Sequence, residues 1–299
     1  LVLREYQDYI NNTTTMKLLL FISCLVISQA TVIRKPDQRE CTGLPINEAL
    51  YDKEILKEGL ERPYLLAVDR SNDILYFSYS LSTNDDQFKS AHIDLKTKQF
   101  ENIDSIVNGF AQTVDQKNHE VYIGSSDGIY KYDYLKRSSV YLAEKGKDIW
   151  NVYFNGILYF SEFPSEFMYT YQDGRVSRFK ELEDTKADHM VIDNDGDIIF
   201  SNATGLFTQK MGTKDAVYFP LSEYVRGLTT DINGVPYVVR YNGISIVDKA
   251  SHTLKKVLDL EDPFGVAFDA NNNMIYSERK ILIRLKHIIK LKCLFVISN

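Results

Sequence analysis

The stretch Pro63-Tyr-Leu-Leu-Ala-Val-Asp69 is followed by a polar turn, Arg70-Ser-Asn-Asp73, and by a second apolar run, Ile74–Tyr79. Tyrosine, valine, isoleucine and phenylalanine favour β-strands. An aspartate at the end of a strand bonds the backbone two residues further on and so favours a tight turn. The stretch therefore predicts an antiparallel hairpin.

The same pattern recurs five more times along the chain. Each copy ends in Asp or Asn and precedes a polar turn and a second strand: Gly109–Asp115, Ile149–Asn155, Ala187–Asp193, Val225–Asp231 and Pro263–Asp269. The six terminal positions are 46, 40, 38, 38 and 38 residues apart, close to the period of propeller blades. We therefore predict an all-β fold, a single six-bladed β-propeller of four-stranded blades.

The last unit lacks a convincing fourth strand of its own. The segment Lys53-Glu-Ile-Leu-Lys57 resembles the outer strands that precede other units, such as Lys256-Val-Leu-Asp259. We expect this N-terminal strand to complete the last blade, which closes the ring and removes exposed sheet edges.

The N-terminus has the pattern of a secretory signal peptide over residues 16–30. Met16-Lys17 precedes the apolar run Leu18–Ser28, and Ser28-Gln29-Ala30 supplies small residues for cleavage. We expect a secreted, extracellular protein with no membrane partner, because the run is too short for a mature transmembrane helix. Residues 1–15 are interpreted as a non-native upstream extension, residues 31–286 as the propeller and residues 287–299 as an atypical tail.

Cys41 and Cys293 lie near the two ends of the expected mature chain. They form a disulfide if the fold brings these ends together; otherwise both are free. No Cys-x-x-Cys pattern is present, which disfavours a thiolate zinc site. Asn202-Ala203-Thr204 is a candidate glycosylation site at Asn202.

Composition limits the classes of partner. The 299 residues are 44% hydrophobic, which is sufficient for a sizeable core, and the net charge is -6 with both signs intermixed. This balance gives no electrostatic reason to expect nucleic acid.

Three segments resemble the insect ommochrome-binding proteins, which are secreted blood proteins of moths and butterflies. The segments are Cys41-Thr-Gly-Leu-Pro-Ile-Asn-Glu48, Leu60–Asp69 and Ile74–Ser80. The resemblance runs from the signal peptide to about Arg284 and implies binding of a tryptophan-derived phenoxazinone pigment. It supplies no ligand-binding residues, so a site has to be argued from position in the repeat.

One repeat position gathers candidate ligand-binding residues, because the first strand of each propeller blade lines the central channel. Five residues before the terminal Asp or Asn, the units present Tyr64, Phe110, Trp150, Asp188, Arg226 and Phe264. At the mouth of the channel, the aromatic rings would stack on a planar pigment and Arg226 would pair with its carboxylate. The alternative is that these side chains only pack between blades.

The second strands return to the same face and add a polar rim. The rim residues are Ser80, Ser126, Glu162, Asn202, Arg240 and Glu278, with His189 and Tyr241 beside them. From this rim, His189, Arg240 and Glu278 complete the candidate ligand-binding set.

Two further functions stay open. A metal-dependent, lactonase-like hydrolase would hold a divalent cation in the channel with Asp188, Glu162, Asn202 and Glu278. Asp193-Asn-Asp-Gly-Asp197 resembles the start of a calcium loop, but Thr204 stands where its last ligand belongs, so we interpret it as a hairpin turn. The other possibility is a secreted protein-interaction propeller. No nucleophile elbow, zinc-protease motif or phosphate loop is present, so we expect a small-molecule carrier without catalytic residues, bound metal or cofactor.

Overall fold

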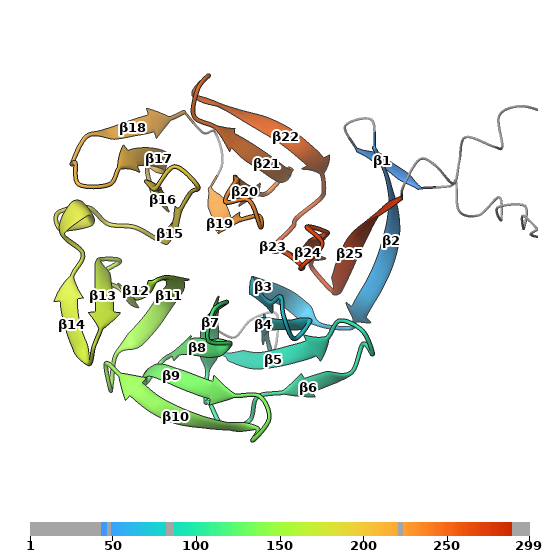
Figure 1. Ribbon diagram of the computed structural model, residues 1–299, viewed down its shortest axis with the longest axis horizontal. Coiled ribbons are helices and arrows are strands. Elements are labelled where there is room, and N and C mark those ends of the chain that lie inside the picture. The colour runs from blue at the N-terminus through green and yellow to red at the C-terminus, as the bar shows by residue number, and fades with distance from the viewer. Residues whose placement is uncertain (1–42, 47–48, 82–86, 221–223, 289–299) are drawn as a thin grey trace, which may run out of the picture. The chain divides into compact units, whose positions relative to one another are not determined.

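Six antiparallel sheets stand around a central axis (Figure 1). The computed structural model describes residues 43–46, 49–81, 87–220 and 224–288. Each sheet is one blade, and its first strand lies innermost in the ring. The predicted six-bladed β-propeller is therefore confirmed.

The first three blades each contain four consecutive strands. Blade 1 consists of β3 (Glu61–Asp69), β4 (Ile74–Ser80), β5 (Phe88–Asp94) and β6 (Phe100–Asn102). Blade 2 consists of β7 (Gly109–Asp115), β8 (Glu120–Ser125), β9 (Gly128–Asp133) and β10 (Ser138–Ala143). Blade 3 consists of β11 (Asp148–Asn155), β12 (Ile157–Phe163), β13 (Met168–Gln172) and β14 (Arg175–Arg178), and a 3₁₀ turn, Lys180–Leu182, follows it.

The last three blades follow the same order until the chain ends. Blade 4 consists of β15 (His189–Ile192), β16 (Asp197–Asn202), β17 (Gly205–Lys210) and β18 (Ala216–Phe219). Blade 5 consists of β19 (Val225–Thr230), β20 (Pro236–Arg240), β21 (Gly243–Asp248) and β22 (Thr253–Asp259). Blade 6 takes β23 (Gly265–Phe268), β24 (Met274–Glu278) and β25 (Ile281–Ile288) from the C-terminal part of the chain.

The N-terminal part of the chain completes blade 6, as predicted. Strand β2 (Ala49–Glu58) pairs antiparallel with β25, from Leu50 opposite Ile288 to Glu58 opposite Ile281. Figure 1 shows the blue β2 beside the red β25. Two details differ from expectation: β1 (Leu44–Ile46) adds a fifth strand outside β2, and β25 continues past the predicted propeller end at residue 286.

The core lies between neighbouring blades. One cluster joins Leu75 and Phe77 of blade 1 to Ile275 and Leu282 of blade 6, and all four side chains are fully buried. Burial of apolar area between sheets, at ~25 cal/mol per Å², is the main force that holds the ring together.

The aspartates that end the inner strands build the turns that follow them. The Oδ1 atom of Asp69 accepts hydrogen bonds from the backbone N–H groups of Ser71 and Asn72, at 3.2 Å each. The Oδ1 atom of Asp269 does the same for Asn271 and Asn273, at 2.9 Å. Equivalent bonds form at three more aspartates: Asp115, Asp193 and Asp231. This confirms the turn chemistry predicted from the repeat.

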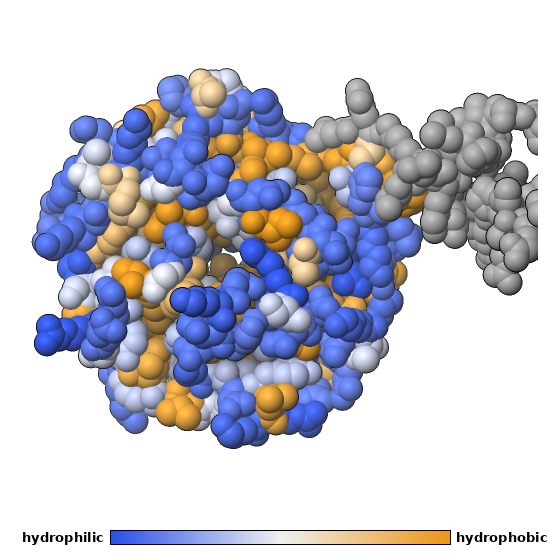
Figure 2. Space-filling model, in the orientation of Figure 1, coloured by the Kyte–Doolittle hydropathy of each residue, from blue (hydrophilic) through white to orange (hydrophobic). Residues whose placement is uncertain are grey.

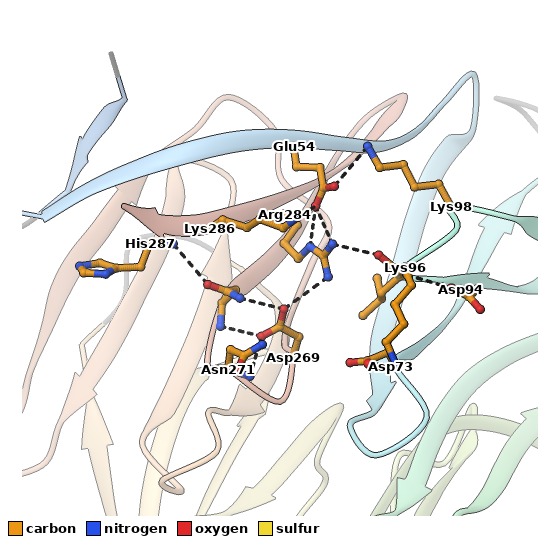
Figure 3. A network of polar contacts seen from close by, with 12 residues as sticks. Glu54, Asp73, Asp94, Lys96, Lys98, Asp269, Asn271, Arg284, Lys286 and His287 are labelled. Carbon is orange, nitrogen blue, oxygen red and sulfur yellow. Dashed lines mark hydrogen bonds and ion pairs between the residues drawn. The ribbon is translucent and has the colours of Figure 1, made fainter. Parts of the chain in front are cut away.

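A buried arginine ties the closing strand to the rest of the ring (Figure 3). The Nε atom of Arg284 on β25 donates to Glu54 Oε2 on β2 at 2.7 Å, and its Nη2 atom donates to the carbonyl oxygen of Leu95 at 2.9 Å. Arg284 also lies 3.5 Å from Asp269. One side chain thus links the N-terminal strand, blade 6 and blade 1.

The Glu54 carboxylate forms ion pairs with two further side chains, Lys98 at 3.2 Å and Lys286 at 3.0 Å. Partial burial alone would raise the pKa of the Glu54 carboxyl. Hydrogen bonds from Lys286, Arg284 and Lys98 outweigh the burial and lower this pKa to about 2, from an ordinary value of 4.5. The ionised carboxylate therefore stabilises the folded ring.

This lowered pKa predicts a stability difference that depends on pH. A folded-state pKa below the unfolded value contributes stability above pH 4.5, and that contribution is lost as the pH falls toward 2. Urea unfolding should show Glu54→Gln roughly 3 kcal/mol less stable than wild type at pH 7, with the gap closing between pH 4.5 and 2. Glu58→Gln, at an exposed position on the same strand, is the control. A gap that stays constant with pH would contradict the assignment.

Several predictions fall on residues outside the described ranges. These are the upstream extension at residues 1–15, the signal peptide at residues 16–30, Cys41, Cys293 and the tail beyond residue 288. Within the described ranges, no helix is long and apolar enough to span a membrane.

Candidate functional site: the central channel

Four of the predicted channel residues do meet at the mouth, where the inner strands begin. The Tyr64 ring centroid lies 5.3 Å from that of Phe264 and 5.7 Å from that of Phe110, and Phe110 lies 4.8 Å from Trp150. We call these four residues the aromatic arc. Phe110 and Phe264 are more than nine-tenths buried, so the arc consists of rings packed on one another across blades 6, 1, 2 and 3.

Arg226 joins the arc but is already paired. Its guanidinium lies 4.7 Å from the Phe264 ring centroid and 5.2 Å from that of Tyr241. The Nη1 atom donates to Asp262 Oδ1 at 2.5 Å and to the carbonyl oxygen of Pro263 at 3.2 Å. Asp262 therefore already balances the charge of Arg226, and pairing of Arg226 with a ligand carboxylate stays a prediction.

The two polar residues of blade 4 are buried near the mouth. The Tyr224 hydroxyl donates to Asp188 Oδ2 at 3.2 Å. Burial, helped by the charge of Glu166, raises the pKa of Asp188. Burial lowers the pKa of His189 to about 4, so this imidazole is neutral at physiological pH.

The remaining rim residues lie at the ends of second strands. Arg240 ends β20 and its Nη2 atom lies 3.3 Å from Ser245 Oγ, and Glu278 ends β24. Asn202 ends β16, where its Oδ1 atom accepts the Thr204 N–H at 2.9 Å and its Nδ2 donates to the Lys186 carbonyl oxygen at 3.2 Å. Its glycosylation stays a prediction.

The open space of the channel lies beyond the arc. A cavity of about 450 Å³ is lined by residues of all six inner strands and of the turns at their ends. Figure 2 shows the ring hollowed at its centre, with hydrophilic residues beside the opening. The lining includes apolar Leu66, Val152 and Val266 and polar Gln112, Asn151 and Thr229.

Most of the predicted ligand-binding residues do not line this cavity. In blade after blade, its lining begins just past the candidate position, at Leu65, Gln112, Asn151, Met190 and Gly227. Phe264 is the only predicted site residue that also lines the cavity. The repeat therefore located the channel, and most of the predicted residues lie at its mouth, beside the cavity. Ligand binding at the mouth stays a prediction.

Two polar groups of the cavity were missed at the sequence level. The Nε2 atom of Gln112 donates to the carbonyl oxygens of Tyr64 and Leu65, while its Oε1 atom is buried without a partner among the described residues. Arg70 follows Asp69 at the turn end of the channel and also lines the cavity. The same alignment could have found it, because the positions after the terminal residues are Arg70, Gln116, Gly156, Asn194, Ile232 and Ala270, with one charge among them.

The acidic turn of blade 4 is occupied by a lysine. Asp193, Asp195 and Asp197 form the one group of three potential metal-ligating side chains found in the described part of the chain. The Lys249 ammonium contacts all three carboxylates, at 2.9 Å from Asp195 and 2.6 Å from Asp197. This agrees with the interpretation as a turn, since Lys249 supplies the positive charge.

The carboxylates named for a lactonase-like cation site do not form such a group. Across the described ranges, Glu162, Asp188 and Glu278 do not come within ligand distance of one another. Glu162 instead pairs with Lys147 at 3.3 Å. The geometry gives no support to the proposed set of ligands.

Comparison with known proteins identifies the family. No protein-family model matches the chain. The ommochrome-binding protein of Manduca sexta is 31% identical over 278 residues, which cover 90% of this chain and 98% of that protein. The chain belongs to the ommochrome-binding protein family. The resemblance noted in the sequence is thereby confirmed, and it extends around the propeller.

Solved structures similar to this family member share its fold at much lower identity. A gluconolactonase from Xanthomonas campestris has a TM-score of 0.64 at 13% identity, over 79% of this chain and 90% of the enzyme. A calcium-binding regucalcin from Agrobacterium tumefaciens has a TM-score of 0.59 at 14% identity, over 79% and 93% of the two chains. At these identities the likeness establishes the propeller fold alone.

Proposed function

We propose that this protein is a secreted carrier that binds and sequesters an ommochrome pigment, or a related tryptophan metabolite, in the cavity at the centre of the propeller. The observation that carries the proposal is the 450 Å³ cavity in a chain whose Manduca sexta relative is an ommochrome-binding protein. Pockets for small organic ligands have volumes of roughly 300–1,000 Å³ and are mostly apolar with a few polar groups.

Sequestration requires no bond chemistry. The apolar side chains of the lining, such as Leu66, Val152 and Val266, would contact the faces of a planar ligand, and the polar groups, which make up the larger part of the exposed lining, would fix its orientation. The aromatic arc would close the mouth of the cavity, with the Phe264 ring as the part that contacts the ligand.

The test is a titration of purified protein with the ommochrome xanthommatin. We expect a saturable shift in visible absorbance at one pigment per chain. We also expect quenching of tryptophan fluorescence, since Trp150 is the only tryptophan and its neighbours Asn151 and Val152 line the cavity. Absence of any spectral change at saturating pigment would contradict the proposal.

The two alternatives make different predictions for the same preparation. A hydrolase of the lactonase type would retain a divalent cation, which metal analysis of the purified protein detects. A protein-interaction propeller would have an undersized channel pocket, whereas the observed cavity falls within the range for small-molecule sites. The cavity therefore favours the carrier over the interaction scaffold.

A further inference from the structure

Arg70 is the single cationic side chain in the lining of the cavity. The charged residues that line it are Arg70, Asp193 and Asp231, and the rest are neutral. Arg70 is half-buried. A charged group in such a position is costly unless it is paired or coordinated.

The backbone at Arg70 is held rigidly. Asp69, directly before it, accepts hydrogen bonds from the next two residues of the turn. The side chain of Gln116 in blade 2 also binds the backbone on both sides of Asp69. Its Oε1 atom accepts the Arg70 N–H at 3.2 Å, and its Nε2 atom donates to the Val68 carbonyl oxygen at 2.7 Å. The Arg70 side chain therefore extends from a backbone position that these hydrogen bonds hold at the turn end of the cavity.

The guanidinium itself has no partner among the described residues. Its Nε atom is buried without a hydrogen bond, and no described carboxylate forms an ion pair with it, although Arg226 and Arg284 pair with Asp262 and Glu54. Arg70 thus differs from the other arginines that are withdrawn from solvent.

The two acidic residues of the lining do not substitute for a partner. Asp193 is held by Lys249. The oxygens of Asp231 accept hydrogen bonds from the N–H groups of Asn233 and Val235 and from the Asn272 amide, at 2.9 to 3.0 Å. Both carboxylates therefore have partners other than Arg70, in their own turns and in the neighbouring blade.

Arg70 lines the cavity together with Tyr153 of blade 3 and Asp231 of blade 5. Burial lowers the pKa of Arg70, and the opposing influences come from Asp231 in blade 5 and Tyr153 in blade 3. These two residues lie on different sides of the ring from blade 1. All three residues therefore belong to the wall of the same cavity.

We propose that Arg70 binds the carboxylate of a planar aromatic acid whose rings lie along the apolar lining residues of the same inner strand, Leu65–Val68. This inference rests on the proposed function, because it places the ligand in the same cavity. From Leu65 to Arg70 the inner strand spans ~16 Å at 3.3 Å per residue, long enough for a three-ring system with its acid group at the turn end. The planar guanidinium matches a carboxylate with two parallel hydrogen bonds.

The experiment compares two fluorescent three-ring probes of the same shape, anthracene carboxylate and the neutral anthracene carboxamide, by fluorescence titration of the full chain. Wild type should bind the acid ~10- to 100-fold more tightly than the amide, as expected for a charge-assisted pair in a partly dry site. Arg70→Gln should remove this difference and leave affinity for the amide unchanged. The Arg70→Gln substitution should not lower the urea concentration at the unfolding midpoint, because it removes a charge that has no partner in the protein.

Arg175→Gln is the matched control, since Arg175 is exposed on the outer strand of blade 3. Unchanged affinity for the acid in Arg70→Gln, or no binding of the acid by wild type, would overturn the inference. Xanthommatin is titrated in parallel. If the acid binds through Arg70 but the pigment does not bind, the carboxylate site stands and the proposed pigment function fails.

Discussion

Replacing Arg284 with methionine should lower the free energy of unfolding by about 3 kcal/mol, the lower end of the range for breaking a buried ion pair. The side chain is 7% exposed and bonds Glu54, Asp269 and the Leu95 carbonyl oxygen (Figure 3). Methionine fills similar space but leaves these acceptors without their common donor. The effect is large because one residue joins the two ends of the ring.

Urea unfolding followed by circular dichroism checks this expectation. Arg279→Met is the matched control in the same blade: Arg279 is 58% exposed and pairs with Glu61 at 3.3 Å, so its loss should cost under about 1 kcal/mol. Arg284→Lys keeps the charge without the planar fork and should fall between the two. Equal losses of unfolding free energy in Arg284→Met and Arg279→Met would contradict a special role for Arg284 in closing the ring.

The fold could be predicted because its information is local and repeated. Each unit carries its own aspartate, turn and alternating strands, so six weak signals supported one another. The closing strand was also within reach, since Lys53–Lys57 resembles Lys256–Asp259. Strand β1 was not predicted, because three residues beside an already complete blade carry no such repeat.

The candidate cavity was predicted only in part, because the alignment indicates which residues share a level of the channel but not which level is open. Tyr64, Phe110, Trp150 and Phe264 do share one level, and their rings pack on one another there. Arg226 was expected to be available, but Asp262 comes from a neighbouring connection whose approach no repeat pattern reveals. Arg70 was overlooked because it occupies a turn position, where arginine is ordinarily a solvated surface residue.

Gly227 offers the sharpest means to test the cavity itself. It lines the cavity on β19, and an added Cβ would lie 3.8 Å from its nearest neighbour, the Val239 Cγ2 atom. Because the glycine has neither a positive φ nor a close contact, the backbone tolerates a side chain there. A phenylalanine ring at Gly227 would occupy volume that the ligand needs, and forcing a ligand past it costs ~1–3 kcal/mol, or roughly 10- to 100-fold in affinity.

The direct test is therefore the affinity of Gly227→Phe for xanthommatin, measured by visible absorbance beside wild type, Gly227→Ala and Val140→Phe. Val140 is 69% exposed on the outer strand β10, so its variant adds a ring away from the channel. We predict a loss of roughly 10- to 100-fold in Gly227→Phe alone. Wild-type affinity in Gly227→Phe, with its unfolding midpoint also unchanged, would show that the pigment does not bind in the cavity.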